Sequence, residues 1–176
     1  MPQGARSFEE LFQETERSAV HLEMRDAYAV ASEAEDFATW RATAVANVDP
    51  ESPYWKPWVA AVRGAVDRGV VVRRARIVSQ PVTAYIKYEH AVTVVNLESG
   101  EDVRWLPRRQ ASNIALPGND FWLFDGRLVR INHFTGDGDG AAEPFEDTDD
   151  PRLTRLCGDA FEAVWQRATP HADFAV

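Results

Sequence analysis

The chain has 176 residues, of which 45% are hydrophobic and 27% charged, and its formal net charge is −9. This length and balance predict one globular domain over residues 1–176, and the acidity argues against a general nucleic-acid binder, because phosphate contacts need clustered Lys and Arg. With a single cysteine, Cys157, the chain can form neither an intramolecular disulfide nor a cysteine-based zinc site.

The first elements follow from local spacing. Ser7 and Glu10 are placed as in a capping box, which predicts a short helix that begins after Ser7. Partial alternation over residues 19–24 predicts a strand. Residues 33–46 carry apolar side chains at helical spacing, and the acidic, proline-containing segment 49–53 predicts a loop.

The next helix has the clearest apolar periodicity of the chain. Its apolar side chains recur every three or four residues, and Gly69 fits the stop position; they are Trp55, Trp58, Val59, Val62 and Val66. Residues 70–78 are rich in β-branched side chains and predict a strand. Arg74 and Arg76 would share one face of that strand and Arg73 the other. Neither face is therefore wholly apolar, and we expect part of the strand to be accessible near its ends.

A second helix–strand pair is predicted over residues 79–107. Residues 79–81 resemble a helix start, with Pro81 in or near the first turn. The helix would run through Tyr85 and His90 toward Gly100, although residues 92–95 are β-prone. Residues 102–106 predict a short strand that ends at Pro107.

A hairpin is the strongest local signal in the C-terminal half. Two apolar runs, 121–124 and 128–134, flank Asp125–Gly126, a pair that accepts the positive φ angles of a tight turn. The acidic, glycine-rich segment 135–150 predicts a mobile loop, and an apolar stripe after Asp150 predicts a final helix. Residues 1–6 and 170–176 are expected to fray.

Together these elements predict an α+β fold: a single domain with a mixed β-sheet, flanked by helices, and a hairpin in its C-terminal half. No apolar run approaches the ~18 residues that a membrane span needs, and no signal-peptide pattern is present. We therefore expect a cytoplasmic protein with neither a membrane nor direct nucleic acid as a partner.

Patterns typical of catalysis or metal binding are missing. The four histidines are far apart in the sequence, so no metal site is predicted; they are His21, His90, His133 and His171. A calcium loop starting at Asp137 would need a carboxylate where Thr148 stands. No nucleophile elbow or phosphate-binding glycine pattern occurs either, so we predict no catalytic residue and no cofactor.

One constellation nevertheless predicts a ligand site. Since the hairpin folds back at residues 125–126, residues 119–122 should lie near residues 129–133. Their polar and aromatic side chains would then converge near one end of the sheet with those of the earlier strand that holds Arg76 and the helix that holds Tyr85. The candidate ligand-binding residues are Arg76, Tyr85, Asn119, Asp120, Trp122 and His133. A structural interpretation competes, in which Asn119 and Asp120 cap a strand and His133 fixes the loop. The many arginines between residues 73 and 130 are interpreted as ion-pair partners of the acidic excess.

Several sequence words carry a family resemblance across nearly the whole chain. They are FEELF (8–12), AVHLEMRD (19–26), RRARIVS (73–79), VRWLPR (103–108), LPGNDFWLFD (116–125), NHF (132–134) and FEAVW (161–165). With these words the chain resembles an uncharacterised actinobacterial family, found mainly in streptomycetes and catalogued as a domain of unknown function. Members of that family are commonly encoded near helix-turn-helix regulators, so the resemblance implies a regulatory context.

The order of elements over residues 70–165 is also similar to one half of the phospholipase D fold, which some sensor domains share without its catalysis. Catalytic members carry His-x-Lys-x-x-x-x-Asp. With the final Asp on Asp125, Gly118 stands at the histidine and Asp120 at the lysine. The nucleophile and the phosphate-binding cation are both missing, so phosphodiester cleavage is not expected.

Three functional hypotheses follow. The first is a non-catalytic regulatory or sensor module that binds a small molecule, a helix-turn-helix transcriptional regulator, or both, with a homodimer as one possible assembly. The second is an enzyme of unrecognised type that uses Asp120, His133 and Arg76 in a pocket beside the hairpin. The third is a purely structural or oligomeric role. The sequence does not identify a ligand.

Overall fold

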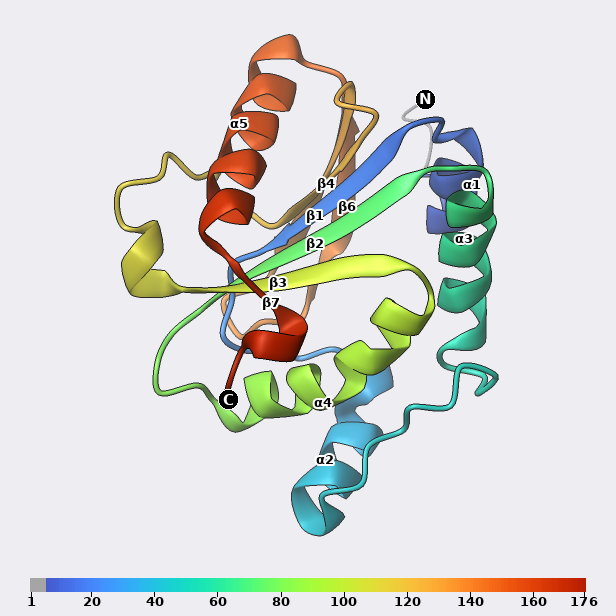
Figure 1. Cartoon of the computed structure of the whole chain (residues 1–176), viewed down its shortest axis with the longest axis vertical. Coiled ribbons are helices and arrows are strands. Elements are labelled where there is room, and N and C mark those ends of the chain that lie inside the picture. The colour runs from blue at the N-terminus through green and yellow to red at the C-terminus, as the bar shows by residue number, and fades with distance from the viewer. Residues whose placement is uncertain (1–5) are drawn as a thin grey trace.

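The computed structural model describes residues 6–176, and within them one mixed β-sheet organises the chain (Figure 1). Its strands lie in the order β6-β5-β4-β1-β2-β3-β7. The strands are β1 (Ser18–Glu23), β2 (Val71–Val78), β3 (Glu101–Pro107), β4 (Phe121–Phe124), β5 (Leu128–Phe134), β6 (Gly140–Thr148) and β7 (Thr169–Pro170). Strands β1, β2 and β3 run parallel, and the other pairings are antiparallel.

Helices cover both faces of this sheet, which confirms the predicted α+β class. They are α1 (Phe8–Glu14), α2 (Ala34–Thr43), α3 (Lys56–Asp67), α4 (Ala84–Glu98) and α5 (Pro151–Arg167), with a short 3₁₀ helix, η1 (Ala31–Glu33), before α2. Figure 1 shows α5 on one side of the sheet, α1 and α3 on the other, and α4 below them. None of the helices in the described part of the chain is long and apolar enough to cross a membrane.

One face of the sheet is apolar and packs against α5. Leu22 of β1 pairs with Ala75 of β2, and these side chains join Phe161 of α5 in one buried cluster. Cys157 is buried there too, and burial raises the pKa of its thiol to about 11, so it is a neutral core side chain at physiological pH.

The opposite face carries charge at its centre. The same register places His21 beside Arg74 and Glu23 beside Arg76, and Arg76 beside Trp105 of β3. Two apolar clusters flank these residues: one holds α1 and α3 against the sheet, and the other holds α4. In Figure 1, α1, α3 and α4 lie around this face of the sheet.

Several local predictions are confirmed. Ser7 and Glu10 form the capping box of α1. Gly69 follows the end of α3 with φ of +92°, a conformation that glycine adopts without strain. Asp125 and Gly126 both have positive φ and connect β4 to β5 as the hairpin turn.

The predicted mobile loop over residues 135–150 is wrong for most of its length. Residues 140–148 form β6, which pairs with β5 on both sides of a register irregularity between Asn132 and Phe134. Arg130 of β5 is fully buried and pairs with Asp147 of β6, with Nε to Oδ1 at 2.7 Å. Asp147, one of the acidic residues that had suggested a solvated loop, is therefore an ion-pair partner within the sheet.

The expected fraying of the C-terminus is also wrong. Strand β7 pairs with β3, and Phe174 is buried with its ring stacked 5.6 Å from that of Trp105. At the other end, Arg6 pairs with Glu14, while residues 1–5, for which fraying was also expected, lie outside the described residues.

The expected accessibility of β2 near its ends is confirmed at its start, where Val71 is exposed. Arg74 and Arg76, in the middle of the strand, are buried at 8% and 4% exposure and pair with carboxylates. One prediction beside β2 needs correction. Pro81 does not lie in the first turn of a helix: α4 begins at Ala84, and its N-cap is Thr83, whose side chain accepts from the Ile86 amide. The β-prone residues 92–95 remain helical because α4 packs on the sheet there.

Candidate functional site

A cleft of about 1130 Å³ opens on the charged face of the sheet. Helices α1, α3 and α4, the segment that follows β1, and strands β4 to β6 all contribute to it. Its walls are mainly aromatic, and among them are Tyr28, Tyr54, Trp58, Tyr85, Trp122 and Phe134. A cleft of this size and lining is typical of a site for a small organic molecule.

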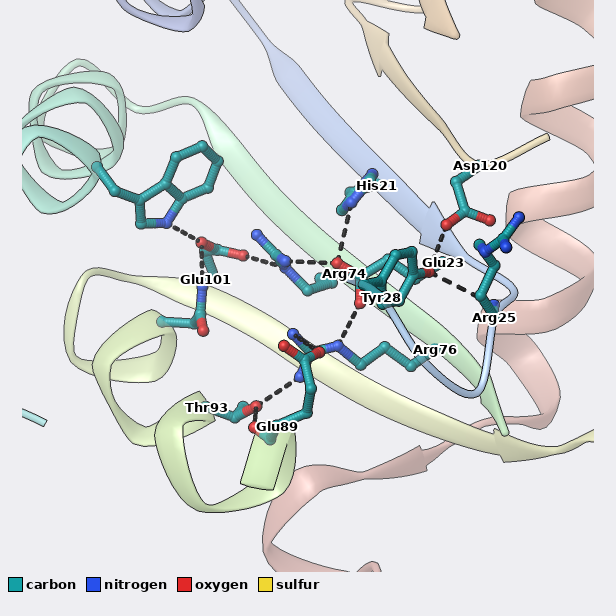
Figure 2. A network of polar contacts seen from close by, with 12 residues as sticks. His21, Glu23, Arg25, Tyr28, Arg74, Arg76, Glu89, Thr93, Glu101 and Asp120 are labelled. Carbon is teal, nitrogen blue, oxygen red and sulfur yellow. Dashed lines mark hydrogen bonds and ion pairs between the residues drawn. The ribbon is translucent and has the colours of Figure 1, made fainter. Parts of the chain in front are cut away.

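Glu23 lines the floor of the cleft and contacts several side chains of the polar network drawn in Figure 2. Its carboxylate lies between two guanidiniums: Oε1 is 2.7 Å from an Nη of Arg74, and Oε2 accepts from Nε of Arg76. Burial favours the neutral acid, but Arg76 and Arg74 outweigh that effect and hold the pKa of Glu23 well below its ordinary value. Glu23 is therefore a fixed anion.

The two arginines extend this network to further carboxylates. Arg74 pairs through Nε with Glu101 Oε2 at 2.9 Å, and Arg76 pairs through an Nη with Glu89 Oε2 at 2.8 Å. The remaining Nη of Arg76 donates to the Thr93 hydroxyl. Each guanidinium is thus held between carboxylates from two elements, with one nitrogen facing each carboxylate, an arrangement that the several donors of the planar guanidinium allow.

Glu101 is the most enclosed of these acids. Its Oε1 accepts from Trp58 Nε1 at 2.9 Å and from Asn96 Nδ2 at 2.8 Å, while its Oε2 faces Arg74. Its side chain has no exposed surface. Helices α3 and α4 are therefore both tied to the first residue of β3 through one carboxylate.

His21 completes the floor beside Trp122. The two rings stack with their centroids 4.3 Å apart and 5° between their planes. Nδ1 lies 2.8 Å from the carbonyl oxygen of Phe121, and Nε2 lies 3.0 Å from Glu23 Oε1. Both partners are hydrogen-bond acceptors, so the imidazole ring connects the Glu23 carboxylate to the backbone of β4.

Glu89 differs electrostatically from Glu23. Burial raises the pKa of Glu89 to about 7, and the neighbouring Glu23 and Glu33 add to the rise against the opposing effect of Arg76. The pKa of Asp120 is also raised by burial, although Tyr28 donates to its Oδ2 and the Met24 amide donates to its Oδ1 at 2.8 Å. The cleft therefore combines one fixed anion with acids whose charge is easily changed.

Five of the six predicted site residues line this cleft. Arg76 forms part of the floor, and Tyr85, Asp120, Trp122 and His133 lie along the walls and rim. Asn119 does not: it is exposed and lines a separate hollow of about 80 Å³ beside Leu153 and Cys157 of α5.

The three residues of the enzyme hypothesis do not form a connected group. His133 Nε2 lies 2.9 Å from Glu146 Oε2, Asp120 is held by Tyr28, and Arg76 is engaged by carboxylates and Thr93. Within the part of the chain that the structure describes, no hydrogen bond joins any two of Arg76, Asp120 and His133.

Sequence reasoning missed most of the floor. Glu23, Arg74, Glu89 and Glu101 come from four different elements, and their meeting depends on the parallel register of β1, β2 and β3. A signal was available in the two-residue spacing of His21–Glu23 and of Arg74–Arg76, because such spacing places charges on one face of a strand.

The interpretation of the central arginines as ion-pair partners is confirmed for those with a carboxylate within 4 Å, namely Arg73, Arg74, Arg76, Arg104, Arg108, Arg127 and Arg130. Across residues 6–176, no group of three or more His, Cys, Asp or Glu side chains is arranged to hold a metal ion.

Comparison with known proteins adds a family and no activity. No curated protein matches the chain. A family model described as a domain of unknown function, DUF6879, matches residues 6–176, which is nearly the whole chain and includes every residue of the cleft. The chain therefore belongs to this uncharacterised family, DUF6879.

Proposed function

We propose that this protein is a non-catalytic sensor or regulatory module whose cleft binds a small organic molecule. The observation that carries the proposal is the cleft itself: aromatic walls stand over a floor of buried, mutually paired charges. Large aromatic surfaces provide apolar contact area, and a few fixed polar groups provide orientation and specificity.

The charged floor supports a binding role better than a purely structural one. Buried ion pairs carry a large desolvation cost, and replacing them with well-packed apolar side chains is often neutral or stabilising. The opposite face of the same sheet is packed with apolar residues such as Leu22, Ala75 and Ile77. Charges retained at equivalent positions on the cleft side are therefore better explained by what the cleft binds.

The enzyme hypothesis has less support. General acid–base catalysis needs a donor or acceptor group free to reach the substrate. Arg76 already contacts Glu23, Glu89 and Thr93, and Asp120 and His133 are held in separate contacts. A sensor that holds its ligand without changing it needs no such free group.

The regulatory part of the proposal depends on the resemblance to actinobacterial proteins encoded near helix-turn-helix regulators. We propose such a regulator as a partner, in the cytoplasm, with the ligand changing the affinity between the two. The likeness to half of the phospholipase D fold contributes no chemistry to this proposal. Co-expression of the chain with the adjacent regulator, followed by co-purification with and without ligand, tests the partnership.

A thermal-shift screen of small molecules tests the binding role, because a ligand that binds only the folded state raises the melting temperature. The matched variants are Ala61→Trp, which places a large ring in the cleft from α3, and Ala42→Trp, which places one on the exposed part of α2 outside it. We expect ligands of the wild-type protein to be lost in A61W and kept in A42W, with unchanged circular dichroism in both.

The binding role is contradicted if no compound stabilises the wild-type protein. It is contradicted equally if the compounds that do so act on a correctly folded A61W with undiminished shifts.

A further inference from the structure

The cleft has an excess of carboxylates at one end, near the start of α3 and the first turns of α4. In the centre of the floor, Glu23 and Glu89 contact Arg74 and Arg76, and Glu101 pairs with Arg74 below the cleft lining. Glu33 of η1 and Asp120 add two more carboxylates to the lining, and in the described residues neither has a cation within 4 Å. Among the residues that line the cleft, acidic side chains therefore outnumber arginines; the acids are Glu9, Glu23, Glu33, Glu89, Asp120 and Asp139, and the arginines are Arg68, Arg74 and Arg76.

Tyrosines hold these surplus carboxylates in place. Glu33 accepts from the hydroxyls of Tyr54 and Tyr85, each at 2.7 Å. Tyr85 OH also lies 3.4 Å from Glu89 Oε1, and its ring centroid is 5.9 Å from that of Tyr28. We call this group, Glu33, Glu89, Tyr28, Tyr54 and Tyr85, the tyrosine–carboxylate end of the cleft.

One buried acceptor in this group, Oε1 of Glu89, lacks a well-placed hydrogen-bond donor. Tyr85 has a single hydroxyl hydrogen, and the distances assign it to Glu33 at 2.7 Å and not to Glu89 at 3.4 Å. Glu89 Oε1 is thus left short of a hydrogen bond, although the residue is only 7% exposed and lines the cleft. Buried acceptors in this condition are costly unless a ligand or water satisfies them.

An anionic ligand does not suit the same cleft. The guanidiniums of Arg74 and Arg76 are occupied by carboxylates, and an anion could reach them only by displacing these. Arg68, which also lines the cleft, donates to backbone carbonyls of Gly64 and Phe12. It lies at the other end of α3, roughly 20 Å from Tyr54 at 1.5 Å per helical residue.

We propose that the tyrosine–carboxylate end binds the protonated amine of an organic cation, whose apolar body lies along the aromatic walls of the cleft. The ammonium N–H groups would donate to Glu33 and to Glu89 Oε1, which supplies the missing donor and offsets part of the excess of acidic side chains. The rings of Tyr28 and Tyr85 offer faces for a cation–π contact. This inference rests on the proposed function, because it assigns a ligand class to the same cleft.

The test uses three probes of similar shape and different charge: phenethylamine, 2-phenylethanol and 3-phenylpropionate. Their affinities are measured by calorimetry on the full chain and on two variants of equal charge change. Glu33→Gln alters the tyrosine–carboxylate end, and Glu35→Gln alters an exposed residue of α2 that does not line the cleft. Glu33 forms no ion pair with any residue from 6 to 176, so E33Q should fold, and circular dichroism verifies this.

We expect phenethylamine to bind the wild-type protein most tightly of the three probes. Its affinity for E33Q should be weaker by about tenfold or more, and its affinity for E35Q should be unchanged. Equal or tighter binding of the alcohol or the carboxylate overturns the assignment of a cation while leaving the cleft a small-molecule site. Equal affinity of E33Q and E35Q overturns the location. If none of the probes binds, the cation inference is overturned, and the wider thermal-shift screen then decides separately on the proposed function.

Discussion

Replacing Glu101 with glutamine tests the energetic role of the buried network most sharply. The glutamine oxygen can still accept from Trp58 and Asn96, but its NH₂ group then stands against Nε of Arg74, where Glu101 Oε2 now accepts at 2.9 Å. Breaking a buried ion pair by removing one partner costs about 3–5 kcal/mol. Arg74 keeps Glu23 at 2.7 Å, so we expect the lower end, about 3 kcal/mol.

The assay is urea denaturation followed by far-UV circular dichroism. The dependence of the unfolding free energy on urea concentration checks that the variant and the wild-type protein expose the same amount of surface on unfolding. For a domain of this size, 3 kcal/mol corresponds to a fall in melting temperature of roughly 6–12 °C. Glu162→Gln is the matched control: Glu162 pairs with Arg73 at 2.6 Å, but its side chain is 49% exposed, and we expect a loss below about 1 kcal/mol. If both variants lose the same small amount, the floor is not the desolvated network described above.

Two further predictions concern the ends of the sheet. Asp125 accepts hydrogen bonds from the backbone amides of residues 16–18 at 2.8–3.0 Å and has φ of +52°. Asp125→Ala should therefore lower the free energy of unfolding, measured by urea denaturation, by about 2–3 kcal/mol, and Asp125→Asn, which tolerates that φ, should lower it clearly less. Equal losses in the two variants would contradict this prediction. Burial and the neighbouring His90 lower the pKa of His171 to about 4. Between pH 6.5 and pH 4 the unfolded chain therefore binds more protons than the folded chain, and the free energy of unfolding decreases as the pH is lowered through that window. His171→Gln should flatten this part of the stability profile, and an unchanged profile would show that the docked C-terminus does not depend on neutral His171, which accepts from Trp105.

Local signals in the sequence predicted local structure well. The Asp125–Gly126 turn, the stop at Gly69 and the capping box at Ser7 each depend on residues within a few positions of one another. The hairpin in turn brought Asp120, Trp122 and His133 toward one cleft, and Arg76 and Tyr85 joined them from adjacent elements.

Features that depend on distant pairing could not be read from local patterns. The acidic segment 140–148 becomes β6 because β5 offers it an edge and the buried Arg130 offers Asp147 a partner. Arg74 and Arg76 could be placed on one face of a strand, but the carboxylates beside them, Glu23 and Glu101, come from the parallel register with β1 and β3. Asn119 was placed in the site by sequence proximity alone, but its side chain lies on the α5 side of the sheet.

We propose that this protein binds a small molecule in the aromatic cleft on the charged face of its sheet. A crystallographic fragment screen on the full chain tests it most directly. We predict fragments in the cleft, contacting Tyr28, Tyr85 or Trp122, with amine-bearing fragments at Glu33 and Glu89. Fragments that bind repeatedly elsewhere on the molecule and leave this cleft empty would contradict the account.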